Sequence, residues 1–360
     1  MNQRSMRSAL AATLLLAATL ERSAGAQAPA ADSTAQKVKK AAFWDDQSIL
    51  NFTLTADFGR FRKDARSRDS VPYRAAKITY LADGKEVAVP VRIKPRGIWR
   101  RKSCDMPPIR LNFNKDSTKN TVFAKQNRVK LVVSCKNADD YEQYVLSEFQ
   151  LYRVYNLLTP LSFQARLAHV TYVDAVKHDT LASRYAFLGE EPEEAAKRLG
   201  GKSFVEKNIQ GNDLDPDTRA IFGVFQYFIG NTDFSVTALH NVLLLQKDSI
   251  LDYVFPVARD FDWSGAVNTR YSFPDYRLPI KNVKQRLMKG DCAPKEVFDK
   301  TFALFREKKP AIYALYHDSL SAPMKADRVR ETLSYFDEFY QQLDDKRAVD
   351  YDIVRACGPS

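Results

Sequence analysis

The sequence predicts an α+β fold in which a mostly antiparallel sheet with one helix precedes a mainly helical part that contains a hairpin. Three observations predict it. Short runs of alternating apolar and polar residues occupy 50–135, which is typical of strands. Apolar residues recur at helical spacing over 141–158 and 217–229. Two further helical patterns, over 294–320 and 326–345, close the chain.

The first 26 residues have the features of a secretory signal peptide. Two arginines precede an apolar run at 9–20, and small residues at 23–26 suit cleavage after Ala26. The run is too short to span about 30 Å of hydrocarbon, so we expect no transmembrane segment after processing. The mature protein is expected to be exported, either to a periplasm or to the extracellular space. Residues 27–45 read as a flexible lead-in.

Positive charge is concentrated early in the chain, which has a formal net charge of +11. One run, RFRKDARSR, lies at 60–68 and is interpreted as a solvated face. The second, KPRGIWRRK, lies at 94–102, where Arg96-Gly97 follows an alternating strand pattern. Glycine allows a ligand to approach the backbone closely, and an arginine side chain can donate two hydrogen bonds to a phosphate. Binding of nucleotide phosphates and a solvated face are therefore both possible interpretations of this second run. Nucleic-acid binding is not expected of an exported protein.

Strand patterns follow one another with clear turn signals. The runs lie at 51–58, at 75–95 with an Asp83-Gly84 hairpin turn, at 107–113 and at 128–135. They predict neighbouring antiparallel strands.

Four cysteines favour disulfides, because an even number is typical of exported proteins. Cys104 precedes one predicted strand and Cys135 ends the next, so a bridge between them is the first choice. Cys292 with Cys357 would then tie down the C-terminal helices. Four cysteines allow three connectivities, and the sequence does not choose among them.

The helix predicted over 141–158, capped by Asp139 or Asp140, carries Glu148 in the middle of its apolar face. A buried carboxylate needs a partner. In kinases a strand lysine upstream forms this pair and aligns the nucleotide phosphates. Lys130 is the expected partner and Arg110 the competing cation, while a structural Glu148 satisfied by Arg153 or a tyrosine is the alternative.

The stretch 222–265 joins an apolar helix, a polar turn, a hairpin and an acidic turn. Gly230 suits the end of the helix that Asp217 begins. The hairpin, with its turn at Asp248-Ser249, should bring Asn241 at its start beside the acidic turn at 260–262.

Oxygen ligands gathered at one edge of a hairpin suit a hard divalent cation. Asp233 precedes the hairpin, and Asn241, Asp260 and Asp262 follow in order. In kinase-like phosphotransferases such an Asp orients the nucleophile and such an Asn and Asp hold metal ions. The order matches those enzymes, but the spacing is longer. Motifs of the commonest serine hydrolases (GxSxG) and zinc proteases (HExxH) do not occur.

NTDFS, HN and PVARDFDWSG, preceded by VRIKPRGIWRRK, PPIRLNF and NRVKLVVSC, resemble the spore-coat CotH family of secreted atypical kinases. The similarity is closer to an uncharacterised branch of exported bacterial proteins with an RG-x-x-R element and paired cysteines. It covers residues 50–292.

This resemblance implies a two-lobed atypical protein-kinase-like fold. The antiparallel N-lobe sheet and one helix would occupy 46–192, and a mainly helical C-lobe with the catalytic hairpin would occupy 193–360. The function implied is transfer of the γ-phosphate of ATP to a protein acceptor with Mg²⁺ or Mn²⁺.

Within that function, Asp233 is the expected catalytic residue and Asn241, Asp260 and Asp262 the metal ligands. The residues expected to bind the nucleotide are Arg96, Arg110, Lys130 and Glu148. The alternative is a catalytically inactive envelope protein that binds an anionic glycan, lipid or protein partner.

Overall fold

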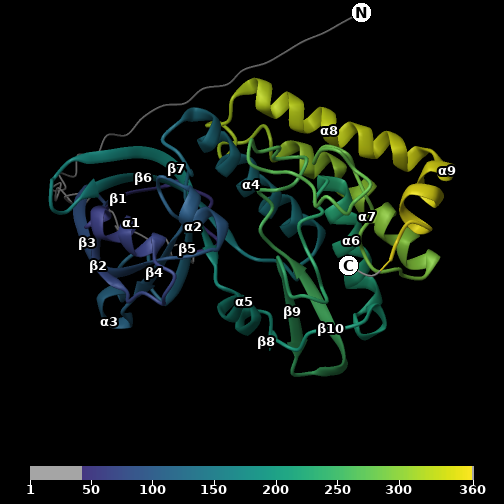
Figure 1. Ribbon diagram of the computed structural model, residues 1–360, viewed down its shortest axis with the longest axis horizontal. Coiled ribbons are helices and arrows are strands. Elements are labelled where there is room, and N and C mark those ends of the chain that lie inside the picture. Colours follow the sequence, from purple (N-terminus) through teal and green to yellow (C-terminus); the bar gives the residue numbers. More distant parts are fainter. Residues whose placement is uncertain (1–42, 359–360) are drawn as a thin grey trace, which may run out of the picture. The chain divides into compact units, whose positions relative to one another are not determined.

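The computed structural model describes residues 43–358, which belong to one compact unit. The predicted signal peptide lies outside the described residues. Seven strands form a closed barrel, drawn purple to teal in Figure 1. They are β1 (Leu50–Ala56), β2 (Arg74–Ala82), β3 (Lys85–Pro95), β4 (Ile109–Phe113), β5 (Arg128–Val132), β6 (Ala165–Asp174) and β7 (Thr180–Glu190).

The closed barrel shows that the predicted two-lobed kinase-like fold with an open antiparallel sheet is wrong. Around the barrel the order is β1-β2-β3-β4-β5-β7-β6, and β1 pairs with β6 in parallel, from Leu50 beside Ala168 to Ala56 beside Asp174. A parallel pair needs a long connection, so no local turn signal reveals it. Closure leaves neither β1 nor β6 with an unpaired edge in the described structure.

The barrel interior is filled by the alternating apolar residues of its strands. Leu50, Phe52, Leu54 and Ala56 of β1 are all buried, as the two-residue period of a strand requires. The helix α1 (Phe58–Arg66) adds Phe58 and Phe61 to this core. The sequence pattern of this segment predicted the end of a strand and a solvated basic run, so the helix α1 was not predicted.

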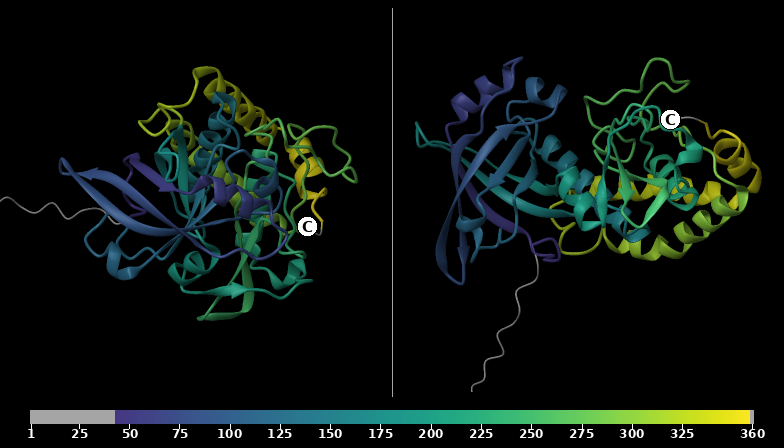
Figure 2. Two further views of the ribbon diagram at one scale, coloured as in Figure 1. Left: turned by 60° about the vertical axis from the view of Figure 1, so that its left-hand side comes forward. Right: turned by 90° about the horizontal axis from the view of Figure 1, so that it is seen from below.

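A small sheet and most of the longer helices follow the barrel strands in the chain, in teal to yellow in Figures 1 and 2. The longer helices are α4 (Asp139–Leu158), α6 (Pro216–Ile229), α7 (Lys295–Ala314) and α8 (Ala326–Asp344). Shorter ones are α2 (Trp99–Ser103), α3 (Lys115–Thr118), α5 (Pro192–Arg198) and α9 (Lys346–Val349). The small sheet contains β8 (Gly201–Phe204), β9 (Val242–Lys247) and β10 (Ile250–Ala258), in the order β10-β9-β8.

The helix α4 connects the barrel to the helical part. It packs on β6 and β7 on one side and contacts α6 and α7 on the other. Its hydrophobic neighbours form a second core, separate from the barrel interior. A helix that is buried this completely fixes the direction of every side chain along it, including that of Glu148.

Most predicted elements are present, with small errors at their ends. The hairpin β9–β10 is confirmed, and Gly230 ends α6 with a φ of 65°. The helix α6 begins two residues earlier than predicted, because Asp215 and not Asp217 is its N-cap. The N-cap of α4 is Ala138, so neither Asp139 nor Asp140 has that role.

Both expected disulfides are formed. Cys104 bonds to Cys135 and Cys292 bonds to Cys357. The first links the end of α2 to the segment after β5, and the second ties the C-terminal segment to the loop before α7. Among the described helices, none is both long and apolar enough to cross a bilayer.

Candidate functional site

Three carboxylates from two distant segments meet beside the barrel. Glu148 comes from the middle of α4, and Asp260 and Asp262 come from the turn after β10. One carboxylate oxygen from each lies within 4.8 Å of the others. We call these three residues the acidic triad. Asp260 has a φ of 65°, a conformation in which non-glycine residues are uncommon.

Burial and mutual repulsion act on the acidic triad together. Burial raises the pKa of Glu148 well above its usual range, and Asp262 and Asp260 raise it further. Burial also raises the pKa of Asp262 to about 6, although Arg100 opposes this shift. For Asp260, Arg96 and other cations outweigh burial and lower the pKa. The cluster is therefore costly without a compensating positive charge.

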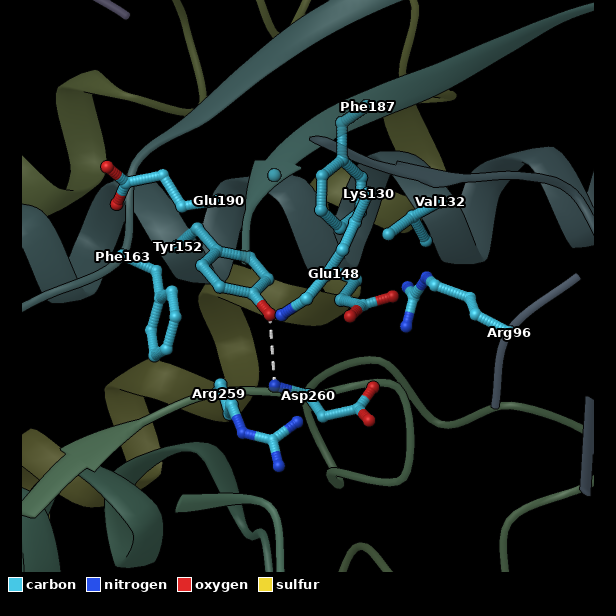
Figure 3. Close-up of a pocket in the computed structure, with 11 residues that line it drawn as sticks. Arg96, Lys130, Val132, Glu148, Tyr152, Phe163, Phe187, Glu190, Arg259 and Asp260 are labelled. Atoms are coloured by element: carbon cyan, nitrogen blue, oxygen red, sulfur yellow. Dashed lines mark hydrogen bonds between the residues drawn. The ribbon is translucent and has the colours of Figure 1, made fainter. Parts of the chain in front are cut away.

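A compact set of cations surrounds the acidic triad. Arg96, Lys130 and Arg259 line one pocket together with Glu148 and Asp260. In Figure 3 the charged ends of Arg96 and Lys130 point into this pocket. Such a mixture of buried charges of both signs is typical of a functional site.

The two arginines nearest to the acidic triad do not use all of their hydrogen-bond donors within the described structure. Among the described residues, the buried Nε atoms of Arg96 and Arg100 have no hydrogen-bond partner. Arg100 contacts Asp262 through Nη1 at 3.5 Å and donates a hydrogen bond from Nη2 to the carbonyl oxygen of Val133. Orphaned donors on buried guanidinium groups fit an anionic ligand.

The pKa values of Lys130 and Arg96 are both lowered. Burial lowers the pKa of Lys130 to about 7, and the positive charges of Arg259 and Arg96 add to this effect. Burial also lowers the pKa of Arg96. An anion in this pocket would restore the ordinary protonation of Lys130.

Aromatic and aliphatic side chains form the remaining walls of the pocket. Phe163, Phe187 and Val132 line it, and Tyr152 accepts a hydrogen bond from the backbone N–H of Asp260 at 3.0 Å (Figure 3). The enclosed cavity has a volume of only about 10 Å³, roughly enough for one water molecule. A larger ligand would require these walls to move.

Asp233 lies in a second group of polar side chains at the start of β9. Asn241 donates from Nδ2 to the Oδ2 atom of Asp233 at 2.9 Å and to its carbonyl oxygen at 2.8 Å. Nε2 of His240 lies 3.0 Å from Oδ1 of Asp233, and this hydrogen bond raises the pKa of His240. The loop before β9 therefore brings Asn241 and Asp233 together. The hairpin places Asn241 beside the acidic turn, since the backbone N–H of Arg259 donates to the carbonyl oxygen of Asn241 at 3.3 Å.

The predicted ion pair between Lys130 and Glu148 is absent from the described structure, although both residues line the same pocket. Glu148 instead faces the other two carboxylates and Arg100. Its other proposed partner, Arg153, is paired with Asp318. Glu148 therefore contributes to the acidic triad and not to a lysine pair.

Arg110, the competing cation, has a different partner. Its Nε and Nη2 atoms donate to the two carboxylate oxygens of Glu191, at 2.5 and 3.1 Å. Glu191 is buried and its pKa is lowered, because Lys130, Arg110 and Arg96 outweigh the effect of burial. This pair holds β4 against the end of β7.

Three further residues contribute to the site and were not predicted. Arg100 and Tyr271 both contact Asp262, the latter by donating from its hydroxyl at 3.0 Å. Arg259 lines the pocket from the residue before Asp260. Arg259 was marked by its position in the motif ARDFD, and Arg100 by its position at the end of the RG-x-x-R element, whereas Tyr271 depends on how its loop returns to the site.

No protein-family model matches the chain, and no curated protein sequence matches it. The function is therefore inferred from the geometry of the site.

Proposed function

We propose that this protein is a phosphotransferase that uses ATP and a divalent cation, Mg²⁺ or Mn²⁺, and that its phosphate acceptor is a protein. The observation that carries the proposal is the acidic triad, with Arg96 and Lys130 in the adjoining pocket. The proposal rests on these side chains and does not require a kinase-like fold, since unrelated folds support the same chemistry.

The donor set fits a hard divalent cation. Three buried carboxylates with oxygens within 4.8 Å of one another repel unless protons or a cation neutralise them. Oxygen ligands are those that Mg²⁺ and Mn²⁺ prefer. Asp260, Asp262 and Glu148 would hold the metal, and Asn241 would be a further ligand from the start of β9.

The cations fit the anionic part of a nucleotide. When bound, ATP supplies the phosphoryl group, and the divalent cation neutralises charge on its phosphate oxygens. Arg96 and Lys130 would bind the phosphates, because their charged groups are buried in the pocket and the Nε atom of Arg96 has no hydrogen-bond partner among the described residues.

Asp233 is the proposed base for the hydroxyl of the acceptor. The hydrogen bonds from Asn241 and His240 fix the orientation of its carboxylate. Its side chain is one-third exposed, so an acceptor can reach it. Asp233 would accept the hydroxyl proton at a carboxylate oxygen.

We propose an exported location, in a periplasm or outside the cell. Two disulfides support it, because such bonds persist in oxidising compartments.

One observation favours a second candidate function. The cavity of about 10 Å³ is too small for a nucleotide as it stands. A catalytically inactive protein would instead bind an anionic glycan, lipid or protein partner at its surface, and this binding would not require the pocket to open.

A thermal-melt series tests the two candidates. A ligand that binds only the folded state stabilises it, so ATP with Mn²⁺ should raise the melting temperature by about 3–6 °C. Asp260→Asn should abolish the shift. Asp275→Asn removes an exposed carboxylate of the following loop and should retain it. Absence of any shift with ATP and Mn²⁺ in the wild-type protein would contradict the phosphotransferase.

A further inference from the structure

The fold brings the two basic runs of the sequence into contact. Arg101 of α2 donates hydrogen bonds to the carbonyl oxygens of Ala65, Asp64 and Ser67, at 2.9, 3.0 and 3.1 Å. These carbonyls lie at the C-terminal end of α1, where a cation is favourable. Residues 60–68 and 98–102 therefore form one surface.

This surface carries positive charge that the described residues do not neutralise. Five of its cations form no ion pair within the described part of the chain: Arg62, Lys63, Arg66, Arg68 and Lys102. Asp64 is buried and is held by Arg74 at 2.7 Å. We call the five cations the basic face.

The helix α2 joins the basic face to the acidic triad. Arg100 contacts Asp262, while its neighbour Arg101 contacts α1. Trp99 packs against Tyr271, with ring centroids 5.1 Å apart, and Tyr271 donates its hydroxyl hydrogen bond to Asp262. Lys102 of the basic face is thus two residues from Arg100, which contacts the triad directly.

Large apolar side chains are exposed along the same path. Ile98 is 87% exposed, Trp99 43% and Phe273 62%. Trp263 bridges the two aromatic ends, since its ring lies 6.3 Å from Trp99 and 4.9 Å from Phe273. Exposed apolar groups next to unpaired cations are typical of an interaction surface.

We propose that the basic face, with Ile98, Trp99 and Phe273, binds an acidic polypeptide segment and holds it beside the acidic triad. The cations attract its carboxylates, and the apolar residues contact its aliphatic or aromatic side chains. That this segment is the phosphate acceptor rests on the proposed function, whereas the binding itself does not.

An anionic membrane would also attract the basic face. The ring of Trp99 is held against Tyr271 and Trp263, and this aromatic row leads toward a buried centre. A polypeptide strand can follow such a row, whereas a bilayer surface cannot, and this favours the polypeptide.

Fluorescence anisotropy with a labelled peptide tests the proposal. The probe contains glutamates around one serine and one tyrosine, and a peptide with lysines in place of the glutamates is its control. The triple variant Lys63→Glu, Arg66→Glu, Lys102→Glu should weaken binding of the acidic probe by at least about tenfold, and added salt should weaken wild-type binding.

A matched variant controls for net charge. Lys85, Lys115 and Lys119 are exposed at the opposite ends of β3 and β4 from α2. Reversing these three charges should leave binding unchanged. Ile98→Ser removes an exposed apolar side chain with little risk to folding, and it should weaken binding without changing the charge. Equal weakening by both triple variants would overturn the proposal.

Two further outcomes are decisive. Failure of the wild-type protein to bind the acidic probe overturns the proposal, and so does binding to vesicles of phosphatidylserine and phosphatidylcholine without binding to the peptide. The melting shift with ATP and Mn²⁺ is measured on the same samples. Peptide binding without the melting shift would refute the phosphotransferase and support the docking surface. A melting shift without peptide binding would refute the docking surface and support the phosphotransferase.

Discussion

At the scale of single residues, the molecule concentrates opposing charges in a buried place. Glu148, Asp260 and Asp262 repel one another, and Arg96 and Lys130 are themselves desolvated. Such an arrangement lowers stability unless a ligand balances it, which is characteristic of sites built for binding.

We expect Glu148→Gln to separate stability from binding. At pH 8, without metal, loss of one clustered carboxylate should leave the free energy of unfolding unchanged or raise it by about 1 kcal/mol. The Mn²⁺-dependent melting shift should disappear. Urea unfolding and thermal melts measure the two effects.

Glu142→Gln is the control on the same helix. Glu142 accepts hydrogen bonds from Arg184 and from the backbone N–H of Tyr185, so its loss should lower stability and retain the Mn²⁺ shift. Equal destabilisation by the two variants would contradict the repulsion described for Glu148.

Lys130 predicts a pH dependence of stability. Its pKa is about 7 in the folded protein, against about 10.4 in an unfolded chain. Between these values the unfolded chain binds more protons, so stability should rise with pH from about 7 toward 10. Each unit of pKa difference corresponds to about 1.4 kcal/mol.

Lys130→Met tests this effect, because it removes the titrating group and keeps much of the side-chain length. The stability gained by Lys130→Met over wild type should be largest at or below pH 7 and should shrink as the pH rises. Urea unfolding at several pH values measures it. A difference that is constant with pH would show that Lys130 does not titrate in this range.

At the scale of elements, local sequence signals predicted most helices and hairpins. The Asp83-Gly84 turn, Gly230 and the period of α4 each act within a few residues, so they are visible without the fold. The predicted N-cap residues of α6 and α4 were wrong, because several acidic residues near the N-terminus of each helix compete for the N-cap position.

Site residues were predictable where polar side chains lie at the two ends of a predicted hairpin. Asp233, Asn241 and Asp260 flank one hairpin, and hairpin geometry alone brings its ends together. The RG-x-x-R element contains Arg100, but the contact of Arg100 with Asp262 was not predictable, since it depends on the path of α2 back from the barrel.

Gly230 should be essential at the end of α6. A Cβ atom there would lie 2.1 Å from the hydroxyl oxygen of Tyr335, and φ is 65°. Gly230→Ala should therefore cost about 3 kcal/mol, from backbone strain and overpacking together. Gly200 has a φ of 76° but nothing within 4 Å of its Cβ position, so Gly200→Ala should cost only about 1 kcal/mol. Chemical unfolding compares them, and equal losses would exclude the steric contribution of Tyr335.

At the scale of the whole molecule, closure of the barrel was the feature that the sequence did not reveal. Each hairpin has a local signal, but the parallel seam between β1 and β6 joins segments that are far apart in sequence. The alternation of apolar and polar residues in β1 shows that one face of this strand is buried. It does not show which strand pairs with β1.

The two disulfides should differ in their effect on the site. Replacing either pair by serine should lower stability by about 4 kcal/mol, as loop-closure entropy predicts for separations of 31 and 65 residues. Cys104 ends α2 and thereby supports Arg100, so loss of the Cys104–Cys135 bridge should also weaken the ATP–Mn²⁺ shift. Loss of Cys292–Cys357 should retain it. Thermal melts measure the stability and the ATP–Mn²⁺ shift of each variant. Equal loss of the shift in the two variants would contradict the role of α2.

The parallel seam also sets an order for biosynthesis. β1 is made early, but its partner β6 emerges only after β2 to β5 and α4 have been made. During that interval the edge of β1 is available to other chains, and pairing across such a sequence distance is slow. A nascent chain that stalls before Ala165 would hold five barrel strands without a seam. We expect such fragments to be the principal source of misassembly and of proteolytic loss for this protein.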